Sequence, residues 1–540
     1  MNNILVYLVL FPILTGSFLG LLKCNNTRKR KILTIVTIFI QSLLLIGSLY
    51  VLTYVKDFGT TAQNIGNWPD FIGITLKADI YAVSFVLMSI SLFTFAIIYQ
   101  LTENDIESRV FSLLIILEGL IIGIFLSNDL FNIFVLIEVA TIVISLLIMY
   151  KKDTISTYDG MLYLLVNIAA MSLFLFGIGM LYKMTGVIDL TGLKDVLSVF
   201  PDKKALIVPY GLMLTAVCLK SAVLPLFSWL PHAHATPSAP SAISAVLSGI
   251  YVKSGIYLFL RLQNVFSDVF DTYYLFLILG FVTAVAGFML AVSQKDIKLI
   301  LAYHTISQIG MIMMGLSMNS ESAYLGAVYH IINHAFFKSC LFLSAGLIIS
   351  AYKSRNVYKI KGVFKNMPIT ATACVMAILG ITGAPLFNGS ISKYWISYGA
   401  KGGWAEYALI LINIGTMISF IKYSGMLTGN YDSTLVKISK KRSVPVLILS
   451  VMCLLGGILS EPIISFLFNV QMSPNLLDYL EKSLLFFVSL GIAYLLYRYA
   501  ISKVNLYKIA SRLELGFNGI CISMGVFFLV MLLYIRIFAM

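Results

Sequence analysis

The stretch KSAVLPLFSWLPHAHATPSAPSAISAVLSGIYVKSG, residues 220–255, decides how the chain folds. It lies in an almost continuously apolar sequence, yet it begins with a lysine, nearly ends with one, and holds four prolines between them. Proline lacks the amide donor that continues a regular helix, so Pro225 and Pro231 predict a broken segment. Broken backbone at membrane depth is tolerated where it lies inside protein or lines a wet cavity. The stretch therefore predicts a membrane protein with an irregular, buried centre.

The composition of the whole chain supports this class. Of the 540 residues, 59% are apolar and 11% are charged. Soluble domains carry about 45–50% apolar and about 25% charged residues, so a soluble globular protein is excluded. No polar linker or Gly/Ser-rich stretch divides the chain, and we expect one membrane domain.

Sixteen apolar runs of about 20 residues are long enough to cross a bilayer. These runs therefore predict an all-α integral membrane protein with about 14–16 transmembrane helices. The runs lie at residues 3–22, 32–54, 79–99, 110–127, 129–149, 160–182, 205–228, 239–260, 272–293, 298–317, 322–351, 370–398, 404–428, 445–468, 479–498 and 515–537.

The formal net charge of +14 does not require a nucleic-acid partner. Loops after odd-numbered runs hold most of the Lys and Arg residues, including clusters at 23–31 and 353–365. The positive-inside rule places these loops in the cytoplasm and both termini outside. We thus expect a multi-pass protein of the cell membrane, oriented in the lipid bilayer by its basic residues. The first run lacks the marks of a removable signal peptide, so we expect a mature helix there.

Cofactor motifs are not found in the sequence. The six cysteines are scattered without a CxxC pair, which argues against an iron–sulfur cluster, a zinc site or a disulfide framework. No phosphate loop appears, and no GxGxxG follows a strand pattern. We expect no cofactor, no metal, and no redox or hydrolytic site in this chain. It can still be a subunit of a redox-driven translocase.

Ionisable residues inside the apolar runs are the candidates for function. A central charge costs about 2.5–3.5 kcal/mol on insertion scales, so seven lysines and glutamates facing lipid would cost roughly 20 kcal/mol. They must face the protein interior, pair with each other or contact trapped water. The residues are Glu118, Glu138, Lys220, Lys253, Lys338, Lys393 and Lys422, together with His304, His330 and His334.

His330, His334 and Lys338 repeat every four residues in YHIINHAFFKSCLF. This spacing stacks them on one helix face, with successive groups about 6 Å apart. Such a face can relay protons, because imidazole titrates near neutral pH. Two alternatives stay open. The His-x3-His pair can bind zinc, although the lysine one turn further opposes a cation, and histidine also forms hydrogen bonds that pack membrane helices.

A second break is predicted in GITGAPLFNGSISKYWI, where Pro385 and Gly389 precede Lys393. The triplet Pro-Leu-Phe occurs at both breaks, at 225–227 and 385–387. A lysine precedes the triplet in the first unit and follows it in the second. Inverted repeats with interrupted helices often mark the sites of transporters, so the pattern favours two related halves.

Other polar positions have alternative roles. His232 and His234 lie in the Pro-rich connection and fit either a turn or a proton exit. Lys422 lies near the end of its run, where a lysine can snorkel to the interface. Glu118 either joins the row of ionisable groups or satisfies a neighbouring lysine. Asp129 is expected to cap the following helix.

Residues 220–261, Glu138 in NIFVLIEVATIVISLL, and HxxxHAxFK at 330–338 together resemble a proton-conducting membrane family. This family comprises antiporter-like subunits of respiratory complex I, of membrane-bound hydrogenases and of multi-subunit (Mrp-type) cation/proton antiporters. The resemblance runs from about residue 60 to 430. It implies a core of about 14 helices with two inverted five-helix repeats, each with one broken helix. The implied parts are N-terminal helices at 1–109, a first repeat at 110–260, a second repeat at 261–430 and C-terminal helices at 431–540.

The resemblance also implies individual roles. Glu138 and Lys220 would form a modulating ion pair in the first half. Lys253 would pass charge towards His304 and the His330/His334/Lys338 face, and Lys393 would be the terminal group at an exit path. Two unit charges near 4 Å interact by about 4 kcal/mol at an effective dielectric of 20, enough to change the protonation of a lysine.

Two features favour particular members of the family. Lysine at 393 resembles the antiporter and other branches, whereas one complex I branch carries glutamate there. The connector at 499–514 would reach only about 24 Å as a helix, too short for the lateral helix of the longest members. A member like the D subunit of an Mrp-type antiporter, or like its counterpart in a hydrogenase-type complex, is favoured. A complex I-like subunit, a self-sufficient Na+/H+ antiporter and a structural spacer are the alternatives. The implied partners are other membrane subunits and H+, with Na+ as the candidate counter-ion.

Overall fold

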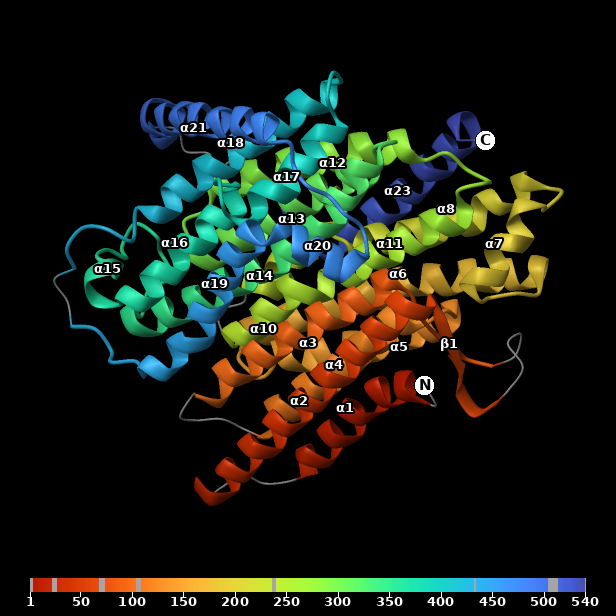
Figure 1. The fold of residues 1–540 in the computed structure, drawn as a ribbon, viewed down its shortest axis with the longest axis horizontal. Helices are drawn as coiled ribbons and strands as arrows, with labels where there is room; N and C mark the ends of the chain where they lie inside the picture. Colours follow the sequence, from red (N-terminus) through yellow and green to blue (C-terminus); the bar gives the residue numbers. More distant parts are fainter. Residues whose placement is uncertain are drawn as a thin grey trace.

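The computed structural model describes residues 3–21, 27–67, 73–102, 108–235, 239–431, 434–503 and 513–539. Nearly all of these residues that have regular structure are helical, and the sheet found among them has two strands. The long helices pack side by side (Figure 1). The chain starts at one flank of the molecule with α1 and α2, and it reaches the opposite flank with α18 and α21.

Fourteen helical segments in the described residues are long and apolar enough to cross a membrane, which confirms the all-α membrane class. They are formed by α1 (Ile4–Leu21), α2 (Thr27–Phe58), α3 (Ile80–Leu101), α4 (Ser108–Leu126), α5 (Leu130–Ile148), α6 (Thr154–Thr185), the continuous run α10 (Ser241–Val246), η3 (Leu247–Tyr251) and α11 (Val252–Phe266), α12 (Tyr273–Ser293), α13 (Ile297–Leu316), α14 (Glu321–Tyr352), α18 (Trp404–Ser424), η4 (Lys440–Arg442) with α19 (Ser443–Ile458), α21 (Leu476–Tyr499) and α23 (Phe517–Phe538).

The remaining described elements are short. They are β1 (Thr61–Asn64), η1 (Ile65–Asn67), β2 (Thr75–Ala78), α7 (Leu190–Ser198), η2 (Lys203–Leu206), α8 (Ile207–Lys220), α9 (Trp229–Ala235), α15 (Val363–Asn366), α16 (Pro368–Thr382), α17 (Asn388–Gly399), α20 (Ser460–Phe468) and η5 (Ile501–Lys503).

Two of the predicted runs are broken helices. In the first of these runs, residues 205–228, α8 ends at Lys220, and Pro225 lies in the turns before α9. Pro231 is the third residue of α9, a position in the first turn where a missing amide costs little. In the second, Pro385 lies between α16 and α17, and Gly389 is the second residue of α17. Residues 236–238 of the first stretch lie outside the described residues.

The order of the helices fits two related halves. One five-member run is α4, α5, α6, the broken α8–α9 pair and α10–η3–α11. The next is α12, α13, α14, the broken α16–α17 pair and α18. In both runs the fourth member is the broken one. The boundaries at 110–260 and 261–430 stay a prediction.

Aspartates set the starts of several helices. Asp79, Asp129, Asp153, Asp189 and Asp296 each accept a hydrogen bond from a backbone amide in the first turn. A short carboxylate is among the preferred N-cap groups, because it satisfies an amide that has no partner within the helix. The expected cap by Asp129 is thereby confirmed, with its Oδ1 2.6 Å from the amide of Asn132.

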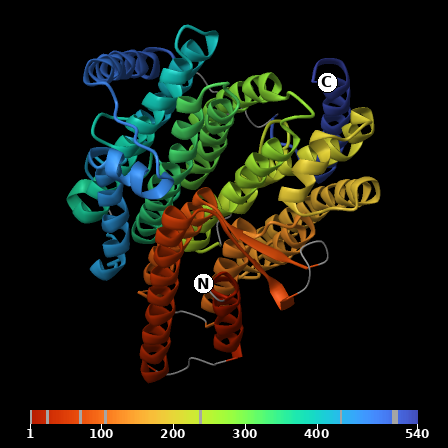
Figure 2. The same ribbon diagram turned by 45° about the vertical axis from the view of Figure 1, so that its right-hand side comes forward.

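Three details of the fold were not predicted from the sequence. The predicted run at 445–468 is two helices, α19 and α20. The last helix, α23, packs against α8 and α6 of the first half (Figure 2). The hairpin of β1 and β2 lies at the same end as the start of α1, where the Leu5 amide donates to Gln63 Oε1 at 3.0 Å. Most of the 499–514 connector lies outside the described residues.

Candidate functional site: a buried row of lysine and histidine

Most of the candidate ionisable side chains lie deep inside the protein. Lys220 is 1% exposed, whereas Glu138 and Lys393 are half-buried. The buried groups face protein and not lipid, as their cost in lipid requires. The members without any exposed surface are Glu118, Lys253, His304, His330, His334 and Lys338.

Lys220 ends α8 at the first break. Its Nζ donates to Thr141 Oγ1 at 3.0 Å and to Asn167 Oδ1 at 3.2 Å, and it also contacts the hydroxyl of Tyr251. These partners come from α5, α6 and η3. Three neutral oxygens from three elements thus hold one ammonium group.

The expected direct ion pair between Glu138 and Lys220 is not among the ion pairs of the described residues. The Lys220 ammonium is bound by the neutral oxygens of Thr141 and Asn167 instead. Glu138 precedes Thr141 by about one turn of α5, and its Oε1 has no hydrogen-bond partner among the described residues. A direct contact is therefore absent among the described residues, Thr141 is one of the groups that touch the lysine, and an influence of Glu138 on Lys220 stays a prediction.

One π-helical turn joins the first two lysines. The turn is η3, and Lys253 follows it directly on α11. Lys253 Nζ donates to the carbonyl oxygen of Ser248, while Tyr251 of the same turn contacts Lys220. The Ser248 hydroxyl lies 2.8 Å from Thr305 Oγ1 on α13. π-turns inside helices occur frequently at functional sites. This turn therefore connects Lys220, Lys253 and α13.

The second half of the row lies on α13 and α14. Lys338 Nζ donates to the Leu301 carbonyl of α13 at 2.6 Å. The rings of His330 and His334 are 6.3 Å apart, close to the spacing expected from their sequence positions. His330 Nδ1 lies 2.8 Å from Ser392 Oγ, and its Nε2 lies 3.1 Å from Gln308 Oε1. His330 therefore links α14 to α13 and to the second broken helix.

Two histidines of the row have unpartnered rings. Both nitrogens of His304 and both nitrogens of His334 lack a hydrogen-bond partner in the described residues. The His304 ring packs 4.8 Å from the ring of Phe420. Neutral imidazole carries one donor and one acceptor, so each ring can still exchange a proton with a mobile partner.

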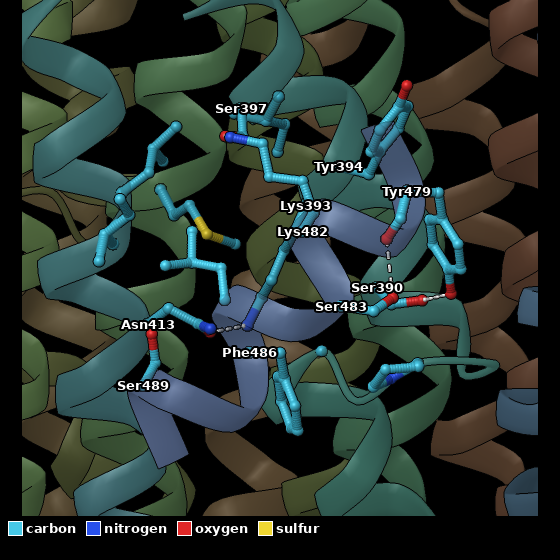
Figure 3. A pocket seen from close by; sticks show the side chains of 17 residues that line it. Ser390, Lys393, Tyr394, Ser397, Asn413, Tyr479, Lys482, Ser483, Phe486 and Ser489 are labelled. Carbon is cyan, nitrogen blue, oxygen red and sulfur yellow. Dashed lines mark hydrogen bonds between the residues drawn. The ribbon is translucent and has the colours of Figure 1, made fainter. Parts of the chain in front are cut away.

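Lys393 reaches a pocket at the second break (Figure 3). Its Nζ donates to the Ile381 carbonyl at 2.7 Å and to Asn413 Oδ1 at 2.8 Å. The pocket has a volume of about 90 Å³ and is walled by α13, α17, α18, α21 and the connection between α16 and α17. Lys482 of α21 also lines it and pairs with Glu406 Oε1 at 2.7 Å. The terminal lysine of the row is thus beside open space, whereas Lys482 is held by a carboxylate.

Other candidate residues lie apart from the row. Glu118 accepts a hydrogen bond from Gln41 Nε2 at 2.6 Å, so its partner is an amide and not a lysine. Lys422 is buried in the protein and donates to the Val292 carbonyl at 2.6 Å. His232 Nδ1 lies 2.8 Å from Asp159 Oδ1. Within the described residues, no group of three or more His, Cys, Asp or Glu is placed to hold a metal ion.

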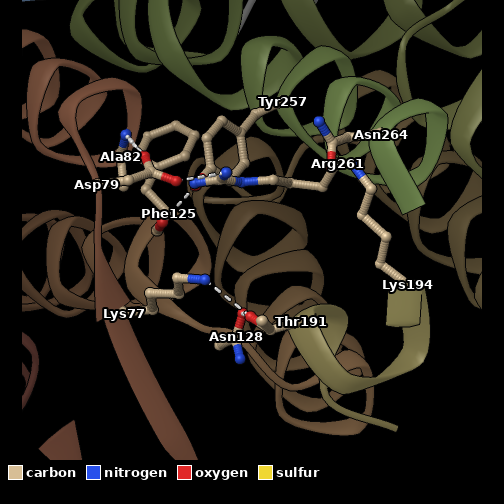
Figure 4. Close-up of polar contacts among 10 residues, drawn as sticks. All are labelled: Lys77, Asp79, Ala82, Phe125, Asn128, Thr191, Lys194, Tyr257, Arg261 and Asn264. Carbon is tan, nitrogen blue, oxygen red and sulfur yellow. Dashed lines mark hydrogen bonds and ion pairs between the residues drawn. The ribbon is translucent and has the colours of Figure 1, made fainter. Parts of the chain in front are cut away.

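Arg261, eight residues after Lys253 on α11, forms an ion pair with Asp79 (Figure 4). Arg261 Nη1 lies 2.6 Å from Asp79 Oδ2, and Arg261 Nε donates to the Tyr257 hydroxyl at 2.9 Å. The Tyr257 hydroxyl donates to the Phe125 carbonyl at 2.6 Å.

Sequence reasoning missed the neutral partners and one further lysine. The neutral partners are single polar residues in apolar helices, and only this polarity could have identified them in the sequence. They are Thr141, Asn167, Gln308 and Asn413. Lys298 is the first residue of a predicted run, a position where a lysine is ordinarily at the membrane surface. It is buried on α13 instead, and its Nζ donates to the Ala239 carbonyl at 3.0 Å.

Comparisons with known proteins agree with this architecture. The family model described as NADH:quinone oxidoreductase/Mrp antiporter, TM, matches residues 127–421. The D subunit of the Na(+)/H(+) antiporter of Alkalihalophilus pseudofirmus is 29% identical over 504 residues, which cover 90% of this chain and 100% of the relative. A chain of the Mrp complex from Dietzia sp. DQ12-45-1b superimposes with a TM-score of 0.77 at 21% identity, covering 94% of this chain and 100% of that chain. A chain of the membrane-bound sulfane sulfur reductase, an archaeal respiratory membrane complex, superimposes with a TM-score of 0.79 at 21% identity, covering 91% of this chain and 99% of that chain.

Proposed function

Because the chain belongs to the NADH:quinone oxidoreductase/Mrp antiporter transmembrane family, we propose that it is a proton-translocating subunit of a multi-subunit membrane complex. The favoured complex is a cation/proton antiporter in which this chain takes the place of the D subunit, because the similarity to such a subunit extends over that protein's full length. Other membrane subunits are then its partners, and Na+ is the candidate counter-ion.

The observation that carries the proposal is the buried row from Lys220 to Lys393. Lys220 and Lys253 are joined by η3, and Ser248 of that turn reaches α13. Lys338 is bound to α13, and His330 connects α13 to the broken helix that bears Lys393. Among the described residues of the row, Glu138 at one end is the only carboxylate. All other members are lysines and histidines, which can gain or lose a proton, and no carboxylate between them cancels their charge.

Each member then has a role. A proton reaches Lys220 under the longer-range influence of Glu138 and passes to Lys253 by way of η3. His304, His330, His334 and Lys338 carry it across α13 and α14. Lys393 releases it into the pocket lined by Asn413. The two halves of this path correspond to repeats at 110–260 and 261–430, with 1–109 and 431–540 as flanking helices.

The proposed orientation follows from the charges. The basic loops, including 353–365, face the cytoplasm of the cell membrane, and both termini lie outside. In this orientation the Asp79–Arg261 pair lies at the outer end of α11. The row itself lies between the two surfaces.

A second candidate is a subunit of a redox-driven pump. The fold agrees with a chain of the sulfane sulfur reductase as well as with a chain of the Mrp complex. In that case the same row would carry protons, and another subunit would supply the driving reaction.

Cation exchange in membrane vesicles separates the two candidates. Vesicles from cells that express the whole operon are given a pH gradient, with and without an electron donor. Wild type is compared with Lys220→Ala and with Lys482→Ala, which removes a lysine outside the row. Sodium exchange without a donor that is lost in Lys220→Ala alone supports the antiporter subunit. Exchange that requires hydrogen, ferredoxin or NADH supports the redox-driven pump. Equal exchange in wild type and Lys220→Ala, at equal assembly, contradicts the row.

A further inference from the structure

Glu118 lies on α4 in surroundings that differ from those of the row. It has no exposed surface. Its Oε2 accepts from Gln41 Nε2 of α2 at 2.6 Å, and its Oε1 has no hydrogen-bond partner among the described residues. Gln41 Oε1 in turn lies 2.7 Å from Thr94 Oγ1 of α3. A polar chain thus leads from Glu118 on α4 to Gln41 on α2 and Thr94 on α3.

In the part of the chain that the structure describes, no cation balances this carboxyl group. The described parts of α1 and α3 carry no charged residue, and α5 carries only Glu138. On α11, Lys253 is bound to the Ser248 carbonyl and Arg261 is paired with Asp79. A buried carboxylate ion with one neutral donor would cost several kcal/mol, and the group avoids this cost by keeping its proton. Glu118 is therefore a carboxylic acid whose Oε1 is left for a further polar partner.

The polar chain ends in a groove between α2 and α3. The groove has a volume of about 100 Å³, and Thr37, Gln41, Ser42 and Thr94 supply its polar wall. Thr37 Oγ1 is a second buried polar atom without a partner in the described residues. Gln41 lies nine residues into the apolar segment Ile32–Phe58, which corresponds to about 14 Å of helix and to nearly half of a hydrocarbon core of about 30 Å. The groove therefore reaches Gln41 from the side, at membrane depth.

We propose that Glu118 is a second protonatable site of this protein, reached laterally through the groove between α2 and α3 and separate from the lysine and histidine row. Its ligand is a proton, with Gln41 as the group that holds the carboxyl group and Thr94 as the group that positions Gln41. The site goes beyond the proposed function, since its properties do not depend on transport through the row.

An apolar carbodiimide tests the site directly. Dicyclohexylcarbodiimide enters from the lipid and reacts with protonated carboxyl groups in apolar surroundings. The carboxyl proton moves to a carbodiimide nitrogen, the carboxyl oxygen bonds to the central carbon, and rearrangement gives a stable N-acylurea. No group leaves, so the modified peptide gains the mass of one reagent molecule. Membranes that contain the whole complex are treated, and the Glu118 peptide is analysed by mass spectrometry.

Two tryptophan variants on α2 test the lateral path. Leu45 lines the groove, whereas the neighbouring Ile46 does not line it and is 63% exposed. We expect an adduct on Glu118 in wild type and in Ile46→Trp, a much weaker one in Leu45→Trp, and none at this position in Glu118→Gln. If Leu45→Trp does not assemble, Ile98→Trp fills the groove from α3. An adduct missing from wild type overturns the proposal, whether or not Glu138 reacts. Equal labelling of the groove variant and Ile46→Trp overturns the lateral path.

Discussion

Thr141 on α5 binds the Lys220 ammonium, with 3.0 Å between Oγ1 and Nζ, at the place where a carboxylate was expected. The same Oγ1 lies 2.9 Å from the Tyr251 hydroxyl of η3. Neutral oxygens, Thr141 Oγ1 among them, therefore hold the first lysine of the row.

Replacing Thr141 should slow transport without preventing assembly. Thr141→Val keeps the shape of the side chain but removes one acceptor from Lys220, and a hydrogen bond to a charged group contributes about 1.5–3 kcal/mol. We expect the exchange rate in vesicles to fall by about tenfold or more, since about 1.4 kcal/mol corresponds to a factor of ten. Thr141→Ser retains the hydroxyl and should retain exchange. Equal rates in the valine and serine variants would show that Thr141 only fills space.

The two lysines of the pocket at the second break should differ in their importance. Lys393→Met should abolish exchange, because Lys393 connects the row to the pocket. Lys482→Met removes a lysine from the same pocket whose charge is paired with Glu406, and exchange should persist. Exchange is measured in vesicles with equal amounts of complex. Loss of exchange in both variants would mean that exchange depends on the total charge of the pocket and not on Lys393 in particular.

His330 and His334 should contribute differently to stability. His330→Ala removes two side-chain hydrogen bonds, to Ser392 and Gln308, while His334→Ala removes none in the described residues. Each hydrogen bond contributes about 1 kcal/mol, so the first variant should be less stable than the second by about 2 kcal/mol. Both leave cavities of similar size. The thermal midpoint of the purified complex should thus be lower for His330→Ala, and the reverse order would assign the structural role to His334.

The Asp79–Arg261 pair should make stability depend on acid. Burial by itself raises the pKa of Asp79, but the Arg261 guanidinium, the Ala82 amide and the charge of Lys77 together outweigh it, so the pKa lies below its ordinary value of 3.8. A carboxyl group with a lowered pKa stabilises the fold above that ordinary value, and the contribution is lost as the pH falls through the pKa of the folded state. Asp79→Asn keeps an N-cap for α3 but removes this dependence. We expect the thermal midpoint of wild type to fall more steeply than that of Asp79→Asn below about pH 4. Parallel curves would show that Asp79 does not contribute to acid sensitivity.

Gly389 should tolerate no side chain at the start of α17. A Cβ there would lie 1.9 Å from the Gly380 carbonyl oxygen, so the two halves of the broken helix would have to separate. Overpacking of this kind costs typically 1–3 kcal/mol and sometimes more. Gly389→Ala should therefore reduce the amount of assembled complex. Gly525→Ala, where a Cβ meets nothing within 4 Å, is the matched control. Normal assembly of Gly389→Ala would show that α16 and α17 can move apart without loss of assembled complex.

The sequence was informative where apolar length and proline decide the structure. The helix number and both breaks followed from the apolar runs and from Pro225 and Pro385. The run at 445–468 reads as one helix by apolar length alone, although Pro462 in the first turn of α20 is a start signal. The return of α23 to α8 had no signal, because a lipid-facing helix and a packed one have similar compositions.

The site was predictable only in part, for a related reason. A lysine or histidine in an apolar run is costly in lipid and therefore conspicuous, whereas Asn167, Gln308 and Asn413 are common enough in membrane helices to escape notice. Glu118 and Glu138 look alike in sequence, on successive helices. Only the packing of α2 against α3 and α4 shows that the partner of Glu118 is Gln41.

The carbonyl oxygens around the row have a consequence for the energy of proton movement. Lys253, Lys338 and Lys393 each donate to a backbone carbonyl, of Ser248, Leu301 and Ile381. An uncharged amine still has two N–H donors, so it can keep this bond after its proton has left. The side chain then has no need to swing between two positions, as it would if it lost a carboxylate partner. On the proposed path, a charge would therefore cross this part of the membrane with little reorganisation of the atoms that carry it.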